Sequence, residues 1–321
     1  MNYRRMGRTG LRISEISFGA WVTFGDQIDE KIASELVHVA YDGGINYFDN
    51  ADIYAHGKAE EVMGRAIRDL PRESLVVSSK VFWKTMEGPN GKGLSRKHIM
   101  ESVDASLARL GLDYLDLYFC HRYDPDTPVE ETVSAMSDLV RSGKILYWGT
   151  SEWRAGQIAN AHRVAAKWGL YPPMVEQPQY NMLARRKVED ELVGCAGDLG
   201  FGMVTWSPLK FGLLSGKYNE KMPDKTRLSR DREWADEVVT ERAIEKVRGL
   251  SQVAAELGVT TAQLAIGWLL RVPQVTSVIT GATKRAQLEE NMKAPEVVDQ
   301  LTGEILERID GILGAETEEL D

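Results

Sequence analysis

The chain has 321 residues and a formal net charge of -9, and 43% of it is hydrophobic, which is the composition of a globular protein with a large core. The acidic balance excludes nucleic acid as an expected partner, because the sequence has no basic stripe that could displace the counterions of phosphates. No window approaches eighteen apolar residues, and no apolar run follows Arg4 and Arg5, so neither a membrane span nor a signal peptide is predicted and the cytoplasm is the expected compartment.

Apolar strands and amphipathic helices alternate through most of the chain. Residues 3–13 are predicted to form a short hairpin, since Gly7 and Gly10 bracket its turn. The strands that follow are each paired with a helix until the last of them. In chain order, the predicted pairs of a strand with its helix are strand 15–19 with helix 29–42, 46–50 with 59–68, 75–80 with a helix from its cap at Ser95 to 110, 115–121 with a helix opened by Pro128, 145–150 with 154–168, and 174–177 with 186–199. Strand 201–206 ends this series.

The alternation stops after this strand. Residues 207–234 contain no periodic element, and a segment of that length in a compact domain is usually functional. Helices are predicted at 237–257 and 261–270, a last strand at 275–280, and further helices at 285–293 and 301–313, with a frayed acidic tail. Most strands recur about every thirty residues, the length of one βα unit. The sequence therefore predicts the α/β class and one (β/α)8 TIM barrel domain over residues 1–321, with extra C-terminal helices.

Polar side chains follow three successive strands of the predicted barrel. Asp49 ends the second strand and Tyr54 lies in the loop behind it, while Lys80 and His121 end the third and fourth strands. Because the carboxyl ends of parallel strands meet at one rim of a barrel, these four side chains should lie together. A buried charge is costly unless it is paired, so we expect Asp49 to pair with Lys80.

These four residue types suit the reduction of a carbonyl group. Lys80 beside Asp49 should stay charged, and its charge should lower the pKa of the Tyr54 phenol towards neutrality. Tyr54 would then act as a general acid towards a carbonyl oxygen that gains negative charge. His121 would donate a second hydrogen bond to that oxygen and orient it.

Other polar or reactive residues in the chain have simpler explanations. Asp52 lies past the end of the second strand and is interpreted as a loop carboxylate that stabilises a turn. His56 is interpreted as loop structure or as a wall of the substrate pocket. Cys120 and Cys195 fall in a strand and in a helical run, which predicts small core hydrophobes and no disulfide. No metal site is predicted.

An aspartate, a tyrosine five residues later, a lysine and a histidine in this order resemble the catalytic tetrad of the aldo-keto reductases. The resemblance extends from Tyr3 to about Asn291 and includes several short motifs. These motifs are Gly149-Thr150-Ser151, Glu176-Gln177, Thr205-Trp206-Ser207-Pro208-Leu209, Ser215-Gly216-Lys217-Tyr218, Gly281-Ala282-Thr283 and Glu290-Asn291. Residues 21–25 are similar to the branch that contains the potassium-channel beta subunits and their microbial relatives.

The resemblance implies a cofactor and a place for the hairpin. Hydride transfer needs a cofactor, because side chains cannot supply hydride. The sequence has no strand-linked Gly-x-Gly-x-x-Gly motif, so NADPH is expected across the top face of the barrel and not on a Rossmann fold. Trp206 would stack on the nicotinamide, and Ser151 and Gln177 would hold its carboxamide. The hairpin would plug the bottom of the barrel.

The phosphates of the cofactor would lie further along the same face. The segment that starts at Ser207 would strap the pyrophosphate, and Gly281 and Thr283 would begin a helix whose N-terminus suits a phosphate. The complete cofactor site implied by the resemblance is Ala20, Trp21, Gln27, Asp49, Ser151, Glu152, Gln177, Trp206, Ser207, Pro208, Leu209, Lys210, Phe211, Lys217, Arg227, Gly281, Thr283, Gln287, Glu290 and Asn291.

Two positions depart from the pattern of the family. Glu152 stands where the family usually has asparagine or arginine, and it could accept from the carboxamide or point to solvent. Gln287 stands where many relatives carry an arginine for the 2′-phosphate, and the channel-subunit branch is glutamine-like there. Four basic side chains nevertheless favour NADPH over NADH, and they are Lys217, Arg227, Lys284 and Arg285.

Three functions are compatible with these residues. The leading hypothesis is an NADPH-dependent reductase of small-molecule aldehydes or ketones. A Schiff-base aldolase that uses Lys80 would need a deprotonated lysine, which Asp49 disfavours. A cofactor-sensing regulatory subunit like the channel beta subunits is the third, and His121 argues against it because those subunits typically have asparagine there. A homo-oligomer is expected over a monomer, and the expected pocket walls are Trp21, Phe24, Trp83 and Trp153.

Overall fold

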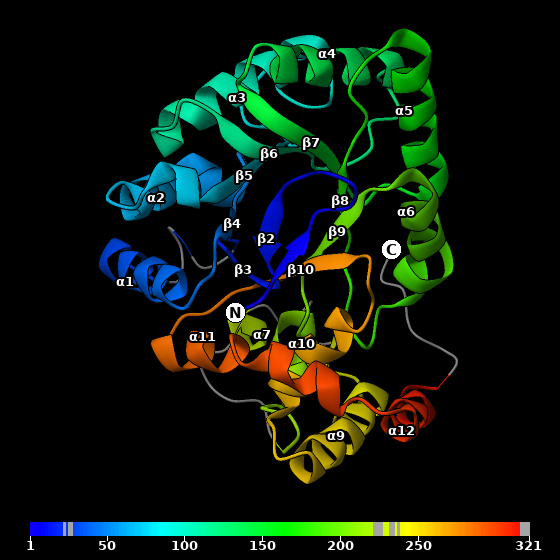
Figure 1. The fold of residues 1–321 in the computed structure, drawn as a ribbon. Coiled ribbons are helices and arrows are strands. Elements are labelled where there is room, and N and C mark those ends of the chain that lie inside the picture. The colour runs from blue at the N-terminus through cyan, green and yellow to red at the C-terminus, as the bar shows by residue number, and fades with distance from the viewer. Residues whose placement is uncertain (22–23, 25–27, 221–226, 231–234, 236–237, 315–321) are drawn as a thin grey trace.

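Parallel strands form a closed barrel in the computed structural model of this chain (Figure 1). The model describes residues 1–21, 24, 28–220, 227–230, 235 and 238–314, and within them the barrel has eight strands. Around the barrel these are β10 (Val275–Thr280), β3 (Ile16–Gly19), β4 (Tyr47–Asp49), β5 (Val76–Val81), β6 (Leu115–Cys120), β7 (Ile145–Ser151), β8 (Val175–Gln177) and β9 (Gly202–Thr205). The ring closes where β10 pairs with β3, with Val278 opposite Ile16. The predicted (β/α)8 TIM barrel is confirmed.

The barrel strands are buried because both of their faces are covered. β5, β6 and β10 are buried along their whole length. One apolar cluster, which includes Tyr47, Leu117 and Val204, is separate from the larger cluster that packs against the helices. Parallel strands covered on two sides have no face in contact with water, so these three strands lack the alternation of buried and exposed residues that a one-sided sheet shows.

The N-terminal hairpin closes the end of the barrel where the strands begin. β1 (Tyr3–Arg5) and β2 (Arg12–Ser14) pair antiparallel, and Met6 between them is fully buried in the inner apolar cluster. Gly7 turns the chain with a φ of 52°, and a Cβ there would lie 2.4 Å from the carbonyl oxygen of Gly200. The hairpin crosses the mouth of the barrel in Figure 1, so the predicted plug is confirmed.

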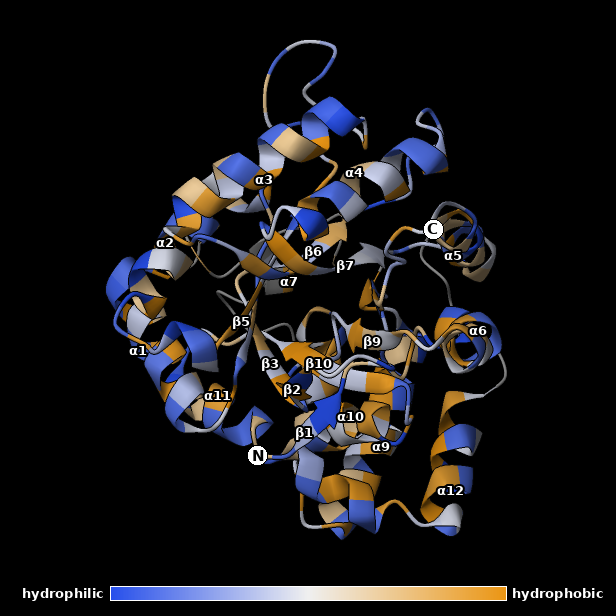
Figure 2. Cartoon of the chain, turned by 45° about the horizontal axis from the view of Figure 1, so that its top comes forward, coloured by the Kyte–Doolittle hydropathy of each residue, from blue (hydrophilic) through white to orange (hydrophobic). Residues whose placement is uncertain are grey.

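Helices surround the barrel and turn their apolar faces towards it (Figure 2). They include α1 (Glu30–Asp42), α2 (Lys58–Ile67), α3 (Arg96–Leu110), α4 (Val129–Arg141), α5 (Ala155–Trp168) and α6 (Val193–Leu199). Side-chain caps fix where two of them start. Asp29 accepts from the backbone N–H of Ile32 at 2.8 Å, and Ser95 accepts from that of His98 at 3.3 Å.

Several short elements differ from the prediction. The predicted helix 186–199 is divided into a π-helix, η3 (Lys187–Leu192), and α6. Short 3₁₀ helices, η1 (Tyr54–Gly57) and η2 (Arg72–Ser74), occur where only loops were predicted. Elements of one or two turns are too short to show a hydrophobic period, which explains why the sequence did not indicate them.

The segment after β9 also contains short helices, although residues 207–234 were predicted to have none. These are η4 (Lys210–Ser215) and α7 (Arg227–Arg230). The remaining C-terminal helices are α9 (Glu241–Glu256), α10 (Thr261–Leu270), α11 (Arg285–Asn291), η5 (Ala294–Gln300) and α12 (Gly303–Leu313). The predicted extra C-terminal helices are therefore present, with α9 starting later than predicted because Thr240 caps it.

No single helix in the described part of the chain is long and apolar enough to cross a membrane. α9 and α10 have the required length and composition only when they are taken together across a bend of 89°.

Candidate active site

The side chains at the ends of β4 and β5 form a buried ion pair. Lys80 Nζ lies 2.7 Å from Asp49 Oδ2, and both side chains are almost completely buried. Lys80 Nζ also donates to the backbone oxygen of Asn50 at 2.6 Å and to the Tyr54 hydroxyl at 3.1 Å. The three N–H bonds of the ammonium group are therefore all used. The structure brings Asp49, Tyr54 and Lys80 together, as the order of the strands predicted.

This arrangement keeps Lys80 in its charged form. Burial by itself lowers the pKa of Lys80, but the Asp49 carboxylate and the Tyr54 hydroxyl outweigh burial, so the pKa is raised from its ordinary value. A Schiff base requires the neutral amine as the nucleophile. The contacts of Lys80 therefore favour an electrostatic role over a nucleophilic one.

Asp49 is fixed by donors from several strands. Its Oδ1 accepts from Ser78 Oγ at 2.8 Å, from Gln177 Nε2 at 3.0 Å and from the Tyr47 hydroxyl at 3.2 Å. These donors belong to β4, β5 and β8, and β8 lies opposite β4 in the strand order of the barrel. The carboxylate therefore extends into the barrel, where hydrogen bonds replace the water that it has lost.

Tyr54 begins η1, in a loop with an unusual backbone. Ala55, His56 and Gly57 have φ values of 47°, 55° and 87°, a region that residues other than glycine rarely adopt. Burial raises the pKa of Tyr54 more than the Lys80 charge lowers it, so the pKa is raised from its ordinary value. The predicted direction was wrong, because the sequence shows the lysine charge but not the burial of the phenol. The phenol keeps its proton at neutral pH, as a general acid must.

His121 directly follows β6 and faces the ring of Tyr54. The two ring centroids are 5.8 Å apart, and the histidine side chain is buried. Burial, together with the charges of Lys80 and Arg122, holds the pKa of His121 well below its ordinary value. The imidazole is therefore neutral at pH 7, and its Nδ1 has no hydrogen-bond partner among the described residues. We call Asp49, Tyr54, Lys80 and His121 the candidate tetrad.

Asp52 is not the turn-stabilising carboxylate that we expected. Its side chain is buried, and within the described ranges neither of its oxygens has a hydrogen-bond partner. Burial and the nearby Glu60 carboxylate raise the pKa of Asp52 well above its ordinary value. Glu60 accepts from Ser79 Oγ at 2.5 Å and forms an ion pair with Arg109 at 2.5 Å. The Arg109 guanidinium therefore already has a carboxylate partner other than Asp52. His56, in contrast, is exposed on the loop.

Aromatic rings flank the candidate tetrad on two sides. Trp21 lies against its tyrosine with 6.4 Å between ring centroids, and Trp83 meets its histidine edge-on at 6.3 Å. Phe24 and Trp153 were also expected in the pocket wall, but both are fully buried in the hydrophobic core. Only the first two therefore form an aromatic wall next to the reacting groups.

Ser151 and Gln177 bond to each other and to the tetrad. Ser151 Oγ donates to the backbone oxygen of Gln177 at 2.9 Å, while the Gln177 amide donates to Asp49. Both side chains are buried at the ends of β7 and β8. The serine oxygen and the glutamine amide oxygen remain as acceptors, which are the groups that the NH₂ of a carboxamide needs. Their contact with a nicotinamide stays a prediction.

Glu152 does not point to solvent. Its Oε1 accepts from Trp206 Nε1 at 2.9 Å and from the backbone N–H of Gln179 at 2.5 Å, and its Oε2 lies 2.7 Å from Lys187 Nζ. Burial opposes ionisation, but the Lys187 charge and these hydrogen bonds outweigh it, so the pKa of Glu152 is lowered. The carboxylate therefore orients the Trp206 indole. Sequence analysis missed Lys187 and Gln179, because no pattern links them to Glu152.

The segment after β9 has a strained backbone where the cofactor strap was expected. Ser207, Lys210 and Phe211 have φ values of 53°, 43° and 56°, and Gly212 follows at 93°. Left-handed residues other than glycine cost free energy and cluster at functional sites. The location of the strain agrees with a binding role for this segment.

Trp21 connects three segments of the expected cofactor site. Its ring centroid is 5.4 Å from that of Trp206 and 6.2 Å from that of Phe211. Ala20, just before it, donates its backbone N–H to the backbone oxygen at the end of β4 at 2.9 Å. Gln27, also predicted for this site, lies outside the described residues. The ends of β3 and β9 and the segment after β9 thus meet beside the tetrad.

The residues expected to begin the last barrel helix lie before it. α11 starts at Arg285, as predicted, so Gly281 and Thr283 belong to the preceding turn and do not begin the helix, as had been expected of them. Gln287 accepts from the backbone N–H of Thr283 at 3.1 Å and from its hydroxyl at 3.2 Å. Gln287 is therefore tied to this turn, and a phosphate contact of these residues stays a prediction.

The other expected cofactor residues differ in exposure. They are buried (Pro208, Lys210 and Asn291), half-buried (Ser207, Leu209 and Glu290) or exposed (Lys217). Arg227 opens α7. Glu290 accepts from Thr260 Oγ1 at 2.6 Å, so it joins α11 to the start of α10. Their roles towards a cofactor stay predictions.

Glu176 of β8 is a completely buried carboxyl group behind this rim. Thr150 Oγ1 donates to its Oε2 at 2.5 Å, and the backbone N–H of Trp153 donates to its Oε1 at 3.2 Å. Burial raises the pKa of Glu176 to about 8, although the Lys187 charge opposes the shift. The carboxyl group is therefore mostly protonated at pH 7.

We expect Glu176→Gln to remove a pH-dependent loss of stability. Between the ordinary pKa of 4.5 and the folded pKa of about 8, the folded state keeps a proton that the unfolded state has released. The free energy of unfolding should therefore fall as pH rises, by about 1.4 kcal/mol per pH unit for this group. Denaturant unfolding across this range should show wild type losing stability relative to the variant. A constant difference would show that Glu176 is ionised in the folded protein.

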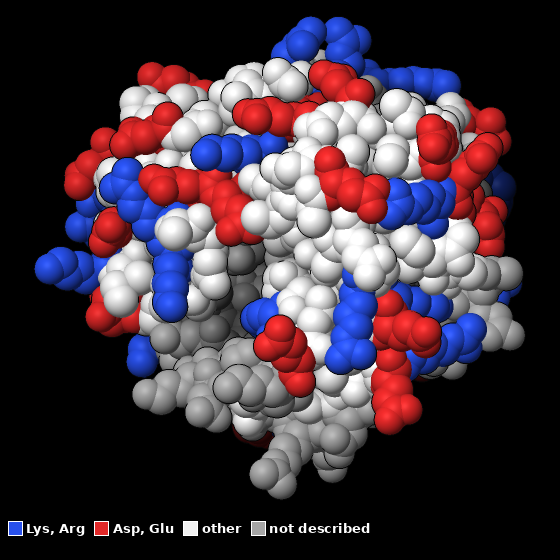
Figure 3. All heavy atoms as spheres, turned by 90° about the horizontal axis from the view of Figure 1, so that it is seen from below, with Lys and Arg blue, Asp and Glu red and all other residues white. Residues whose placement is uncertain are grey.

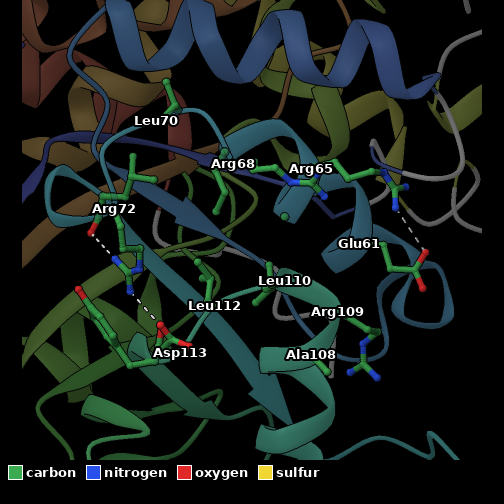
Figure 4. Close-up of a pocket in the computed structure, with 15 residues that line it drawn as sticks. Glu61, Arg65, Arg68, Leu70, Arg72, Ala108, Arg109, Leu110, Leu112 and Asp113 are labelled. Atoms are coloured by element: carbon green, nitrogen blue, oxygen red, sulfur yellow. Dashed lines mark hydrogen bonds and ion pairs between the residues drawn. The ribbon is translucent and has the colours of Figure 1, made fainter.

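A groove of about 380 Å³ lies outside the barrel, between the C-terminal ends of α2 and α3 (Figure 4). Arg65, Arg72 and Arg109 line it, and each is paired with a carboxylate. The two helix ends also direct carbonyl oxygens there, which disfavours a bound anion. No member of the tetrad lines this groove, and the loops that lead into the strands form its edge. The groove is therefore not part of the candidate active site.

Charged side chains of both signs alternate on the molecular surface. On the face shown in Figure 3, Lys and Arg form small separate areas between Asp and Glu. In the part of the chain that the structure describes, no group of three or more His, Cys, Asp or Glu side chains is placed to hold a metal ion. Cys120 and Cys195 are free thiols in β6 and α6.

The chain matches one protein family over nearly its whole length. The model of the Aldo/keto reductase family matches residues 15–313. A "Probable voltage-gated potassium channel subunit beta" of Oryza sativa subsp. japonica is 49% identical over 318 residues, which cover 98% of this chain and 97% of that protein. A protein of the same name from Arabidopsis thaliana shows the same identity and coverage. A "Putative voltage-gated potassium channel subunit beta" of Schizosaccharomyces pombe is 44% identical over 319 residues, covering 97% and 93%.

Proposed function

Because this chain belongs to the aldo/keto reductase family, we propose that it is an NADPH-dependent oxidoreductase that reduces small aldehydes or ketones to alcohols. The observation that carries the proposal is the contact between the Tyr54 hydroxyl and Lys80 Nζ at 3.1 Å. It places a protonated phenol beside a fixed cation at the carboxyl end of the barrel. His121 adds a neutral hydrogen-bond donor beside the phenol, with 5.8 Å between the two ring centroids.

Each member of the tetrad has a separate task in this reaction. The Tyr54 hydroxyl gives its proton to the carbonyl oxygen as negative charge develops there. The Lys80 ammonium, held in place by Asp49, stabilises the phenolate that remains. The His121 imidazole donates a hydrogen bond to the same oxygen and orients the carbonyl group.

NADPH, when bound, supplies the hydride that no side chain can provide. The donors and acceptors at the barrel rim fit its nicotinamide. Ser151 and Gln177 present acceptors for the carboxamide, and Trp206 presents an indole that Glu152 orients. The strained backbone from Ser207 onward fits a segment that straps the phosphates.

A screen of aldehydes and ketones tests this function. NADPH absorbance should fall when one of the carbonyl compounds is added, in proportion to the amount of protein. Protein with the Tyr54→Phe substitution is the matched control, because it keeps the ring packing and should oxidise NADPH far more slowly. A broad panel of aldehydes and ketones that all fail to oxidise NADPH would reject the proposal.

A cofactor-sensing regulatory subunit is the second candidate, favoured by the names of the relatives from rice, Arabidopsis and fission yeast. In that role, NADPH would bind tightly while no aldehyde is turned over. Measuring NADPH binding and aldehyde reduction on the same protein preparation separates the two candidates. A Lys80 Schiff-base aldolase is disfavoured, and borohydride trapping in the presence of substrate would detect it.

We predict that NADPH binds more tightly than NADH. A 2′-phosphate can form charge-assisted hydrogen bonds with basic side chains of the strap and of the turn before α11, such as Lys217 and Lys284. The difference in Kd should shrink as salt rises, because salt screens exposed charges. Quenching of tryptophan fluorescence measures the Kd of NADPH and the Kd of NADH. Lys144→Gln, which removes a positive charge on the far side of the molecule between α4 and β7, is the control for general loss of charge. Equal or reversed affinities at low salt would contradict the prediction.

A further inference from the structure

Two cations lie beside the aromatic wall that Trp83 forms next to the candidate tetrad. The Arg122 guanidinium carbon is 5.5 Å from the centroid of the Trp83 ring, and Lys92 Nζ is 5.8 Å from it. Arg122 is half-buried, and Lys92 is exposed. Among the described residues, no carboxylate forms an ion pair with either of them. Two positive charges thus lie at this wall in a chain whose net charge is -9, and the charge of Lys92 also helps to lower the pKa of Asp124.

Arg122 is also close to the reacting groups. It follows His121 directly, and both residues contact the Trp83 ring, whose centroid is 6.3 Å from that of the imidazole and 5.5 Å from the guanidinium carbon. Its charge adds to the effect of burial in lowering the pKa of His121, and at Tyr54 it opposes the effect of burial. The guanidinium therefore acts on the donors that would meet the carbonyl oxygen.

The hydrogen bonds of Arg122 leave most of its donors for a ligand. Its Nη1 donates to the backbone oxygen of His121 at 2.6 Å, which uses one of five N–H bonds. The nearest acidic neighbour in the chain is engaged elsewhere, because Asp124 accepts from the backbone N–H of Leu94 at 2.7 Å and from Thr127 Oγ1 at 2.8 Å. A half-buried guanidinium that has no carboxylate partner keeps donors that an anionic ligand can use.

We propose that the substrate is a carbonyl compound with an anionic group, a carboxylate or a phosphate monoester, and that Arg122 binds this group while the carbonyl meets Tyr54. This inference rests on the proposed reductase function. The planar guanidinium matches the two oxygens of such a group, which a lysine cannot do. Lys92 adds attraction from the rim of the pocket, and Trp83 separates the charged group from the reacting carbon.

The first test compares succinic semialdehyde with its methyl ester, which has nearly the same shape and no charge. Wild type should reduce the anion with the higher kcat/KM. Arg122→Gln should lower kcat/KM for the anion by about 10- to 100-fold, mainly through KM, which is the effect of losing one charged hydrogen bond. The kcat/KM for the ester should fall much less than that for the anion, because Arg122 affects the ester only through its charge near His121 and Tyr54. Arg122→Lys should recover part of the loss.

A second pair, glycolaldehyde phosphate and glycolaldehyde, tells a phosphate substrate from a carboxylate substrate. The anion with the larger dependence on Arg122 identifies the preferred class. Lys84→Gln is the matched control, since Lys84 lies in the loop after β5 that also carries Lys92, is exposed and already pairs with Glu87 at 2.7 Å. It should leave all four rates unchanged. Equal loss of the charged and neutral substrates in Arg122→Gln would overturn the proposal.

Binding in the absence of NADPH separates this inference from the proposed function. Succinate and succinamide can be titrated into the protein while tryptophan fluorescence is followed, and this needs no turnover. Succinate should bind more tightly to wild type than succinamide does, and Arg122→Gln should abolish the difference. If succinate binding depends on Arg122 in this way but the protein reduces no aldehyde, the proposed reductase function is rejected and the proposed anion site at Arg122 is retained. Succinate binding that does not depend on Arg122 would overturn the anion site, whatever the activity.

Discussion

Tyr54→Phe should lower kcat for aldehyde reduction by about 100- to 10,000-fold, the usual contribution of a positioned general acid. The substitution removes one hydroxyl and keeps the ring that packs against Trp21 and His121. NADPH affinity should change little, because the hydroxyl contacts Lys80 and would contact the substrate oxygen, not the phosphates of the cofactor. The measurement is the rate of NADPH oxidation beside the Kd for NADPH, for wild type and variant.

Tyr123→Phe is the control for this experiment. Tyr123 is half-buried and packs edge-on against Trp153 at 4.9 Å, so it loses the same hydroxyl outside the tetrad. Its reduction rate should match that of wild type. Because the pKa of Tyr54 is raised, the phenol stays protonated as pH rises from 7 to 9, so the reduction rate should not fall in this range through loss of the acid. A Tyr54→Phe variant that reduces aldehydes at nearly the wild-type rate would transfer the acid role to His121, the first residue to replace next.

Lys80→Met should abolish reduction and destabilise the fold as well. The substitution leaves the Asp49 carboxylate buried without its cation, and removal of one partner of a buried ion pair costs about 3–5 kcal/mol. It also removes the charge that would stabilise the Tyr54 phenolate. Denaturant unfolding at neutral pH measures the first effect, and NADPH oxidation with an active aldehyde measures the second.

The double variant Lys80→Met with Asp49→Asn separates charge from packing. Because it has no unpaired charge, it should recover about 1–3 kcal/mol of the stability that Lys80→Met loses. Its activity should stay as low as that of the single variant. If Lys80→Met unfolded at the same denaturant concentration as wild type, the ion pair would not contribute to the fold, and the hydrogen bonds from Tyr47, Ser78 and Gln177 would suffice to hold Asp49.

Tyr54→Phe and Lys80→Met probe different parts of the candidate tetrad. Tyr54 supplies the proton, and its loop keeps a left-handed backbone at Ala55 and His56. Lys80 is the cation on which that loop and β4 converge, through its bonds to Tyr54 and to the Asn50 backbone. A loss of activity without a loss of stability is therefore expected for the tyrosine, and a loss of both for the lysine.

The sequence determined the barrel and the position of the tetrad along it. Recurrence of βα units about every thirty residues places the ends of consecutive strands at one rim, so Asp49, Lys80 and His121 had to be neighbours. The helix cap at Ser95 was equally visible, because a cap depends on residues only three positions apart. Periodicity and local hydrogen bonding are properties of short stretches of sequence, and these were the features predicted correctly.

Only the tertiary structure decided the electrostatics of the site. The pKa of Tyr54 moves up and not down, and Asp52 is a buried carboxyl without a partner, since segments distant in sequence exclude water from both. Glu152 reaches Trp206 and Lys187 across 54 and 35 positions of the chain, which no spacing rule indicates. Desolvation and long-range pairing depend on which elements cover a side chain, and that information exists only once the barrel has closed.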